Sequence, residues 1–185
     1  MDYLSPEILK TLTGYSKNYL ERPVSEDWTI RPIQAKDNKA MARIIRTVMS
    51  EYSCVGEGYS IQDPEVDFLS TVYNSDRSFY WVIEKGSEIL GGAGIGPLKG
   101  ASDDYCELKK MYFSSQLRGK GLGRKLADIL LEKAKEAGYK YCYLETVERL
   151  STANILYQKL GFERLTAPIG DTGHGSCEFQ YLRSL

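Results

Sequence analysis

The sequence predicts an α/β (α+β) domain, in which helices flank a mixed, mostly antiparallel sheet. Two observations lead to this fold class. Strand-forming runs at 79–84 and 88–95 are joined by Lys85-Gly86-Ser87, which is typical of an antiparallel hairpin. Further along, a strand-like run at 105–113, a helical stretch and a second strand-like run at 139–147 form a strand–helix–strand unit, which indicates a parallel pair.

The composition is that of a soluble globular domain. The chain has 185 residues, of which 42% are hydrophobic and 26% charged, and its net charge is −1. Because there is no basic excess, we do not expect nucleic-acid binding. No apolar run approaches the roughly 18 residues of a membrane span, and MDYLSPEILK lacks the basic start and apolar core of a signal peptide. We therefore expect a cytoplasmic protein with no nucleic-acid or membrane partner.

The cysteines do not predict a metal site. Cys54, Cys106, Cys142 and Cys177 are far apart and include no C-x-x-C pair, and His174 is the single histidine. Cys106 and Cys142 lie in apolar strand-like runs, so we interpret them as reduced core residues.

Residues 1–27 are predicted to form a helical appendage to a domain at 28–185. Ser5-Pro6 is a typical helix start, and Arg22-Pro23 is expected to end the element. One face of this helix either packs on its own domain or contributes to a homodimer contact. The apolar residues of that face are Ile8, Leu9, Leu12, Tyr15 and Tyr19.

The first part of the domain is predicted to contain a strand and two helices. The strand is at 28–33, and Asp37 is placed to cap a helix with apolar residues from Met41 to Met49. Asp63-Pro64-Glu65 starts a second helix that continues to Tyr73. The loop between them is suited to a cationic amine, although a solvated loop has the same composition. Its acidic and aromatic residues are Glu51, Tyr52, Glu57, Tyr59 and Asp63.

Alternation along the strand at 105–113 places Tyr105, Glu107, Lys109, Met111 and Phe113 on one face. The preceding strand has glycines at 91, 92 and 94, which mark either a bulge or a close approach of another group to the backbone.

The last part is predicted to alternate helices and strands. A helical stripe begins after Gly121 and ends before Gly138, and a strand follows it at 139–147. The remaining elements are expected to be a helix from Ser151 or Thr152 to Leu160 and strands at 162–165 and 177–182.

The stretch Gln116-Leu117-Arg118-Gly119-Lys120-Gly121-Leu122-Gly123-Arg124 joins the strand at 105–113 to the next helix. Glycines let the backbone approach a ligand, and a helix that begins there offers unpaired N–H groups and the positive end of its dipole. With Arg118, Lys120 and Arg124 beside it, this turn predicts an anion site, most suited to phosphate. A glycine-rich turn with solvated basic residues is the alternative.

The order of elements and the residues of this turn resemble the GNAT superfamily, the GCN5-related N-acetyltransferases, over about residues 28–183. The family motif Q/R-x-x-G-x-G/A is matched by Gln116-Leu117-Arg118-Gly119-Lys120-Gly121, between the expected strand and the expected helix. A second signature is matched by Leu156-Tyr157-Gln158-Lys159-Leu160-Gly161-Phe162. The resemblance implies a GNAT-type sheet whose strands splay apart at a coenzyme A (CoA) site.

The resemblance also implies how the co-substrate acetyl-CoA binds. Its pyrophosphate is expected on the backbone N–H groups from Arg118 to Arg124, and its pantetheine arm on the backbone of Met111 and Phe113. Relatives often have an asparagine seven residues before the signature tyrosine, where this chain has Leu150, and Asn154 lies on a different helix face. The residues expected at the CoA site are Met111, Tyr112, Phe113, Gln116, Leu117, Arg118, Gly119, Lys120, Gly121, Leu122, Gly123, Arg124, Asn154 and Tyr157.

For catalysis, the resemblance implies direct acetyl transfer from the thioester to an amine, without a metal. Glu107 is expected to be the general base and Tyr157 the general acid, and the Phe113 N–H to donate to the developing oxyanion. The alternatives are that Glu107 pairs with Lys109 or Lys110 at the sheet surface and that Tyr157 is structural.

The loop 168–175 is implied to overhang the acceptor side of the gap between the splayed strands. Asp171, Thr172 and His174 are candidates for acceptor recognition or proton transfer, and the alternative is a glycine-rich hairpin loop with an exposed histidine. The resemblance predicts an acetyl-CoA-dependent N-acetyltransferase, of EC 2.3.1 type, acting on a primary amine of a small molecule or protein. A non-catalytic CoA-binding sensor or interaction module with a GNAT fold is the alternative.

Overall fold

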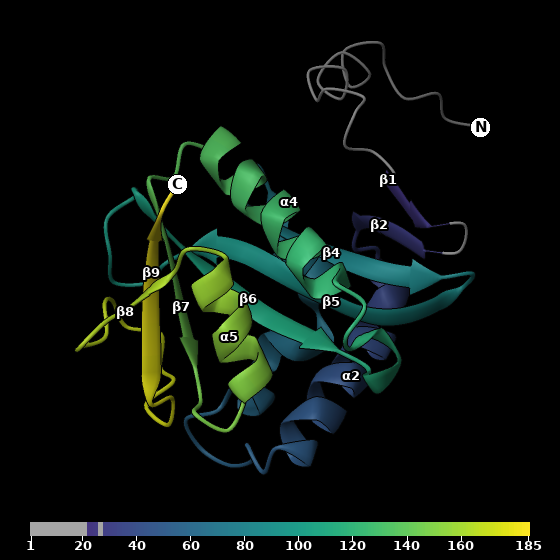
Figure 1. The fold of residues 1–185 in the computed structure, drawn as a ribbon, viewed down its shortest axis with the longest axis horizontal. Coiled ribbons are helices and arrows are strands. Elements are labelled where there is room, and N and C mark those ends of the chain that lie inside the picture. Colours follow the sequence, from purple (N-terminus) through teal and green to yellow (C-terminus); the bar gives the residue numbers. More distant parts are fainter. Residues whose placement is uncertain (1–21, 26–27) are drawn as a thin grey trace.

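The computed structural model describes residues 22–25 and 28–185, which form one sheet with helices on both of its faces (Figure 1). The strand order is β1-β2-β4-β5-β6-β7-β9-β8, with β3 beside β4. β6 and β7 are parallel, and the other neighbouring strands in these ranges are antiparallel, which confirms the predicted fold class. The strands are β1 (Arg22–Ser25), β2 (Trp28–Pro32), β3 (Asn74–Ser75), β4 (Ser78–Lys85), β5 (Glu88–Pro97), β6 (Tyr105–Phe113), β7 (Tyr141–Thr146), β8 (Glu163–Arg164) and β9 (Phe179–Ser184).

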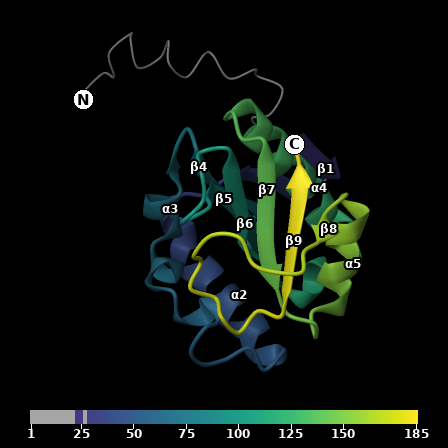
Figure 2. The same ribbon diagram turned by 90° about the vertical axis from the view of Figure 1, so that its left-hand side faces the viewer.

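The helices form two layers, which Figure 2 shows on opposite sides of the sheet. α2 (Asn38–Glu51) and α3 (Leu69–Val72) cover one face, and α4 (Leu122–Glu136) and α5 (Ser151–Lys159) cover the other. Each layer buries its own apolar core against the sheet. In the part of the chain that the structure describes, no helix is both long and apolar enough to cross a membrane.

Short 3-10 helices connect several of these elements. They are η1 (Ala35–Asp37), η2 (Ser60–Gln62), η3 (Pro64–Asp67) and η4 (Ser115–Leu117).

Several predicted element boundaries shift by one or two residues, and two predicted elements differ by more than that. Residues 22–25, which the sequence predicts to belong to the appendage, form β1 and pair with β2, so the sheet begins before residue 28. The helix predicted from Asp63 to Tyr73 is divided into η3 and α3, because Phe68 has a non-helical conformation (φ −134°, ψ 30°). The predicted helix start at Ser5-Pro6 lies outside the described residues.

Asp37 precedes α2 as predicted, but its carboxylate does not cap that helix. It accepts hydrogen bonds from Arg31 at 2.6 Å and from the backbone N–H of Gln34 at 2.8 Å. Burial alone would raise the pKa of Asp37, but these two donors lower it below its usual range. Since Arg31 also pairs with Glu84 at 2.6 Å, the cluster ties the start of α2 to β2 and β4.

A β-bulge in β6 reverses the predicted direction of its last side chains. Gly94 lies opposite Lys109 and Gly92 lies opposite Tyr112, so Lys110 and Met111 share one partner position. Lys110 has a positive φ of 51°, and its carbonyl accepts a hydrogen bond from the buried Tyr80 hydroxyl at 2.8 Å.

The prediction that Glu107, Met111 and Phe113 share one face is therefore wrong. Met111 and Phe113 pack with the core under α4 and α5. Glu107 faces the opposite layer, where its charge acts on Tyr73 of the α2 and α3 core.

The β5 glycines allow aromatic rings to lie against the strand. A Cβ at Gly92 or Gly94 would come within 2.5 or 2.6 Å of the Tyr80 ring, and a Cβ at Gly91 would overlap the Phe113 ring. The close approach predicted for these glycines is therefore made by the protein's own side chains.

β6 and β7 separate at the middle of the sheet. They pair from Tyr105 and Tyr141 to Glu107 and Tyr143, and no β6–β7 pair follows within the described ranges. β7 instead pairs with β9 up to Thr146. The predicted splaying of these two strands is confirmed, and the side chains beyond the last pair face an open space.

Candidate active site

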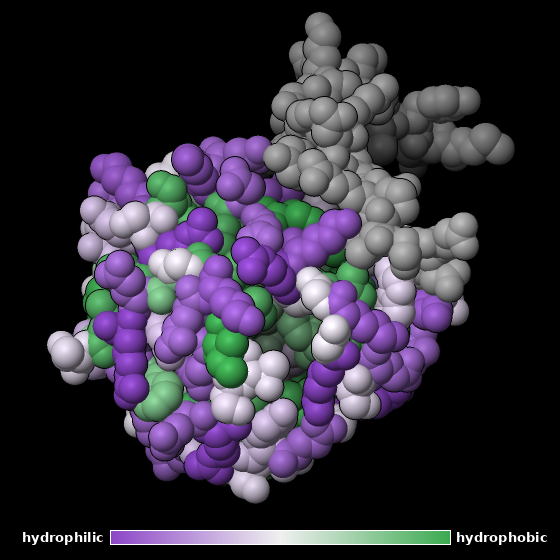
Figure 3. All heavy atoms as spheres, in the orientation of Figure 1, coloured by the Kyte–Doolittle hydropathy of each residue, from purple (hydrophilic) through white to green (hydrophobic). Residues whose placement is uncertain are grey.

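A cavity of about 800 Å³ lies where β6 and β7 separate. On the face shown in Figure 3, apolar side chains line a hollow that polar side chains surround. One part of the cavity, the turn half, is formed by Met111, Phe113, the turn 117–124 and Tyr157. The other part, the carboxylate half, is formed by Glu107, Lys109, Glu145, His174 and neighbouring residues.

The turn half contains the predicted anion site. α4 begins directly after Gly121, whose φ of 73° only glycine adopts without strain, and Gly119 has a φ of 77°. A Cβ at either glycine would meet no atom within 4 Å, so the backbone is open toward a ligand. Arg118 and Arg124 line the same region. The unpaired N–H groups at the start of this 15-residue helix and the two arginines suit a phosphate group.

Most of the residues expected at the CoA site line the cavity. Those that do are Met111, Tyr112, Phe113, Leu117, Arg118, Gly119, Gly121, Gly123, Arg124 and Tyr157. Three others within the turn point elsewhere: Leu122 is buried, Gln116 is exposed, and the Lys120 ammonium lies over the Trp28 ring at 4.9 Å.

Asn154 is also away from the cavity lining. Its amide nitrogen donates to the carbonyls of Val147 at 3.0 Å and Leu150 at 3.1 Å. These bonds hold the turn between β7 and α5 and direct the Asn154 amide nitrogen to the backbone. Its carbonyl oxygen is buried and has no hydrogen-bond partner among the described residues.

Glu107 is a buried carboxylate at the point where β6 leaves β7. It is 3% exposed, and its nearest cation is the Lys109 ammonium at 3.8 Å. Burial raises the pKa of Glu107, and the charge of Lys109 only partly opposes this. Lys110 does not contact Glu107 but pairs with Asp63 and Glu65. Glu107 therefore forms the expected ion pair with Lys109 but not with Lys110, and it is a buried carboxylate whose pKa is raised.

Tyr157 projects from α5 into the cavity. Its ring packs against Phe162 and Tyr181, and the residue is 7% exposed. Burial raises the pKa of the Tyr157 hydroxyl well above its ordinary value. No hydrogen bond reaches this hydroxyl from the described residues, so it is a protonated group that is free to donate.

Glu145 is a site residue that no sequence motif indicates. It lies on β7 two residues after Tyr143, the partner of Glu107, so alternation directs both carboxylates to the same side of the sheet. Glu145 accepts hydrogen bonds from the Tyr143 and Thr172 hydroxyls, each at 2.6 Å. Combining the predicted strands with their parallel pairing would have located it.

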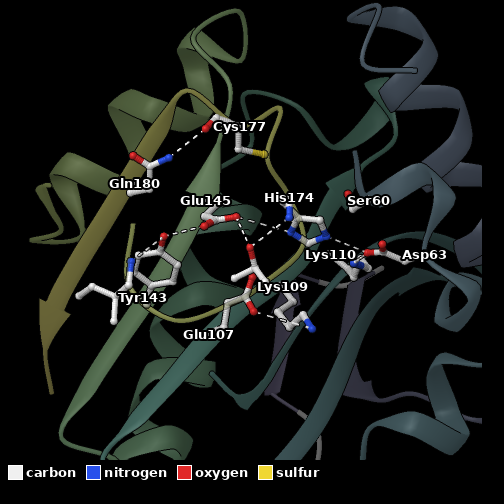
Figure 4. Close-up of polar contacts among 12 residues, drawn as sticks. Ser60, Asp63, Glu107, Lys109, Lys110, Tyr143, Glu145, His174, Cys177 and Gln180 are labelled. Carbon is white, nitrogen blue, oxygen red and sulfur yellow. Dashed lines mark hydrogen bonds and ion pairs between the residues drawn. The ribbon is translucent and has the colours of Figure 1, made fainter. Parts of the chain in front are cut away.

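His174 lies between two carboxylates, as Figure 4 shows. Its Nε2 is 3.0 Å from an Asp63 oxygen, and its Nδ1 is 3.7 Å from a Glu145 oxygen. The His174 side chain is 11% exposed, so the alternative of an exposed loop histidine is wrong. Thr172 also reaches this cluster, but Asp171 is exposed and pairs with Lys99 at 3.5 Å.

Asp63 connects this cluster to the bulge in β6. It pairs with the almost fully buried Lys110 ammonium, which also lies 3.3 Å from Glu65. Burial would raise the pKa of Asp63, but the hydrogen bond with His174 and the charge of Lys110 lower it to about 2. The start of η3 is thereby held against β6 and the loop 168–175.

In the described ranges, no group of three or more histidine, cysteine or acidic side chains is arranged to hold a metal ion.

Comparisons with known proteins agree with this geometry. Residues 42–162 match the acetyltransferase (GNAT) family. The uncharacterized N-acetyltransferase YjgM of Escherichia coli K12 is 47% identical over 157 residues, which cover 84% of this chain and 94% of that protein.

Two solved structures share the fold. An acetyltransferase of the GNAT family from Staphylococcus aureus Mu50 superposes with a TM-score of 0.74 at 20% identity, covering 85% of this chain and 99% of that one. YncA of Salmonella typhimurium, a putative acetyltransferase solved with its cofactor acetyl-CoA, superposes with a TM-score of 0.64 at 21% identity. The match covers 86% of this chain and 92% of that one.

Proposed function

This chain belongs to the GNAT family of acetyltransferases, and we propose that it acetylates a primary amine of a small molecule. It is an N-acetyltransferase that uses acetyl-CoA as its co-substrate. The identity of the acceptor and the roles of individual residues are the proposed part.

The turn half is proposed to bind the donor. The N–H groups between Arg118 and Arg124 would hold the pyrophosphate, because this backbone is open, lies at the N-terminus of α4 and has the two arginine side chains beside it. The backbone edge of Met111 and Phe113 that does not pair with β7 would bind the pantetheine arm as an added strand does. The thioester would then lie near the gap between β6 and β7.

Transfer is proposed to be direct. An alkylammonium, with a pKa near ~10.4, must lose a proton before it attacks, and Glu107 is the buried carboxylate available for this. The Phe113 N–H would stabilise the oxyanion, and Tyr157 would protonate the leaving thiolate. Burial raises the pKa of Cys177 to about 12, so this cavity cysteine is a poor nucleophile for a covalent intermediate.

One observation favours a small acceptor over a protein. The loop before η2 and the loop before β9 meet beside the carboxylate half, where the Ser176 hydroxyl donates to the Glu57 carbonyl at 3.1 Å. The His174–Asp63 contact at 3.0 Å joins the same two segments. These contacts enclose that half, so a folded protein surface would have to displace both loops.

Thiol release from acetyl-CoA tests the proposal. The panel contains small primary amines and, separately, lysine-containing peptides, and the acetylated product is identified by mass spectrometry. We expect turnover with small amines. Turnover with the peptides alone would contradict the small acceptor, and CoA binding by calorimetry without turnover would favour a non-catalytic binding module.

A cytoplasmic location is proposed as well. All four cysteines are free thiols, three of them buried, as expected of a protein from a reducing compartment.

A further inference from the structure

The acetyl transfer releases one proton, and the site must deliver it to solvent. An ammonium nitrogen loses two protons when it becomes an amide, while the CoA thiolate takes up one. The balance is R–NH3⁺ plus acetyl-S-CoA giving R–NH–acetyl, CoA-SH and H⁺. Glu107 is only 3% exposed, so a second group with access to solvent would serve this release.

The hydrogen bonding of His174 fixes which ring nitrogen can accept a proton. Asp63 is ionised near neutral pH, because its pKa is about 2. An ionised carboxylate only accepts hydrogen bonds, so in a neutral imidazole the 3.0 Å contact places the proton on Nε2. Nδ1 is then unprotonated, and its distance of 3.7 Å to Glu145 leaves it without a hydrogen bond from that residue.

Charged groups from several elements lie around the imidazole. Asp63 from the start of η3 and Glu145 from β7 lie on its two sides, and Glu107 on β6 is close enough for the two charges to interact. Two positive charges lie near these three carboxylates. One is Lys110 of β6, which pairs with Asp63 and Glu65. Lys109 of β6 lies between Glu65 and Glu107. A proton on Nδ1 would thus face the Glu145 carboxylate.

We propose that His174 is a second catalytic base, whose Nδ1 takes the first proton from the acceptor ammonium, while Glu107 takes the second. This assignment rests on the proposed N-acetyltransferase reaction. The neutral amine then attacks the thioester carbon, the N–C bond forms, and the C–S bond breaks. Tyr157 protonates the thiolate and is reprotonated by the proton held on Glu107, whereas the proton on His174 leaves to solvent beside the partly exposed Asp63.

The test exploits the fact that the chain has a single histidine. NMR titration of this imidazole gives its midpoint without assignment, and kcat/KM is measured against pH with the best amine of the panel. We expect the acidic limb of kcat/KM to have the same midpoint as the imidazole. In His174→Gln we expect kcat/KM to fall by roughly 10²- to 10⁴-fold and this limb to disappear, with unchanged CoA affinity.

Asp171→Asn is the matched control, because it removes a carboxylate from the same loop at an exposed position outside the cavity. It should keep the wild-type profile. Glu145→Gln provides a second variant if His174→Gln does not fold: the imidazole midpoint should move to lower pH, and the acidic limb should move with it.

Three results would overturn the proposal. The first is an acidic limb of kcat/KM that persists in His174→Gln, and the second is a kcat/KM for that variant similar to the wild type. The third is an acidic limb in Glu145→Gln whose midpoint does not move with that of the imidazole. Absence of turnover in the wild type with every amine would instead contradict the N-acetyltransferase function, and this role of His174 with it.

Discussion

Burial raises the pKa of both Glu107 and Tyr157, with opposite chemical consequences. A raised pKa makes the Glu107 carboxylate a stronger base, whereas it keeps the Tyr157 hydroxyl protonated as a donor. The two residues face the cavity from opposite sides of the sheet, Glu107 from β6 and Tyr157 from α5. Proton removal and proton delivery can therefore be assigned to two different residues of one cavity.

Replacing Glu107 with glutamine should reduce activity and increase stability. Because the folded-state pKa is raised, ionisation of Glu107 opposes folding, and this cost develops as pH rises from about 4.5 through the raised pKa. Glu107→Gln removes it, and Lys109 keeps Glu65 as a partner at 3.7 Å. At pH 7 we expect kcat/KM to fall by roughly 10²-fold or more and Tm to rise by about 2 to 4 °C. A lower Tm with unchanged kinetics would contradict this account.

Replacing Tyr157 with phenylalanine should affect chemistry without affecting donor binding. The ring contacts with Phe162 and Tyr181 remain, and only the hydroxyl is lost. We expect kcat to fall roughly ten- to a thousandfold, with the calorimetric Kd for CoA unchanged. An unaltered kcat would remove Tyr157 from the mechanism.

At the scale of elements, the β6 bulge and the turn before α4 decide where the site forms. The bulge turns Met111 and Phe113 toward α4 and α5 while Glu107 stays on the opposite face. After β6, the positive φ values of Gly119 and Gly121 bend the chain so that the turn also lines this cavity. Backbone conformation at a few residues thus brings the two halves of the cavity together.

Two glycines at opposite ends of α4 allow the turn to be tested with a matched control. Gly121 and Gly138 have φ values of 73° and 84°, and a Cβ at either meets no atom within 4 Å. Gly121→Ala and Gly138→Ala should each lower the free energy of unfolding by about 1 to 2 kcal/mol. Only Gly121→Ala should weaken CoA binding, by roughly tenfold (about 1.4 kcal/mol) in calorimetry. Equal CoA affinities would show that Gly121 has no role in the anion site.

The sequence predicted the elements whose signals are local, and it missed features that arise from pairing. The hairpin of β4 and β5, strand β6 and helices α4 and α5 follow from short-range periodicity and capping. The bulge was not predicted because Lys110, a non-glycine residue, has positive φ.

The site, like the fold, was predictable where its residues are contiguous in the sequence and not where they come from distant segments. The motif located the turn half, because its residues are contiguous. The cluster of Asp63, Glu145 and His174 comes from three distant segments, and only Asp63 and His174 had been singled out, for separate reasons.

At the scale of the whole molecule, one cavity contains both the proposed CoA site and the proposed acceptor site. Among the residues that the structure describes, those lining the cavity lie between positions 48 and 177, and they come from both helical layers and the sheet between them. The CoA motif and the acceptor loops therefore meet only in the complete fold.

A chain that starts at residue 22 should keep full activity, because every cavity-lining residue in the part of the chain that the structure describes lies at position 48 or later. We predict unchanged kcat/KM and CoA affinity for this truncated chain. Size-exclusion chromatography of both forms tests whether residues 1–21 contribute to a homodimer. A loss of activity that accompanies a change of oligomeric state would show that the appendage is part of the enzyme.

Initial-velocity kinetics test most directly whether acetyl passes straight from CoA to an amine in this cavity. Both substrates are varied, using the best amine of the panel. Direct transfer requires both to be bound together, so we predict intersecting lines in double-reciprocal plots and no acetylated enzyme in mass spectra. Parallel lines, with an acetyl group recovered on Cys54 or Cys177 of the cavity, would contradict the account.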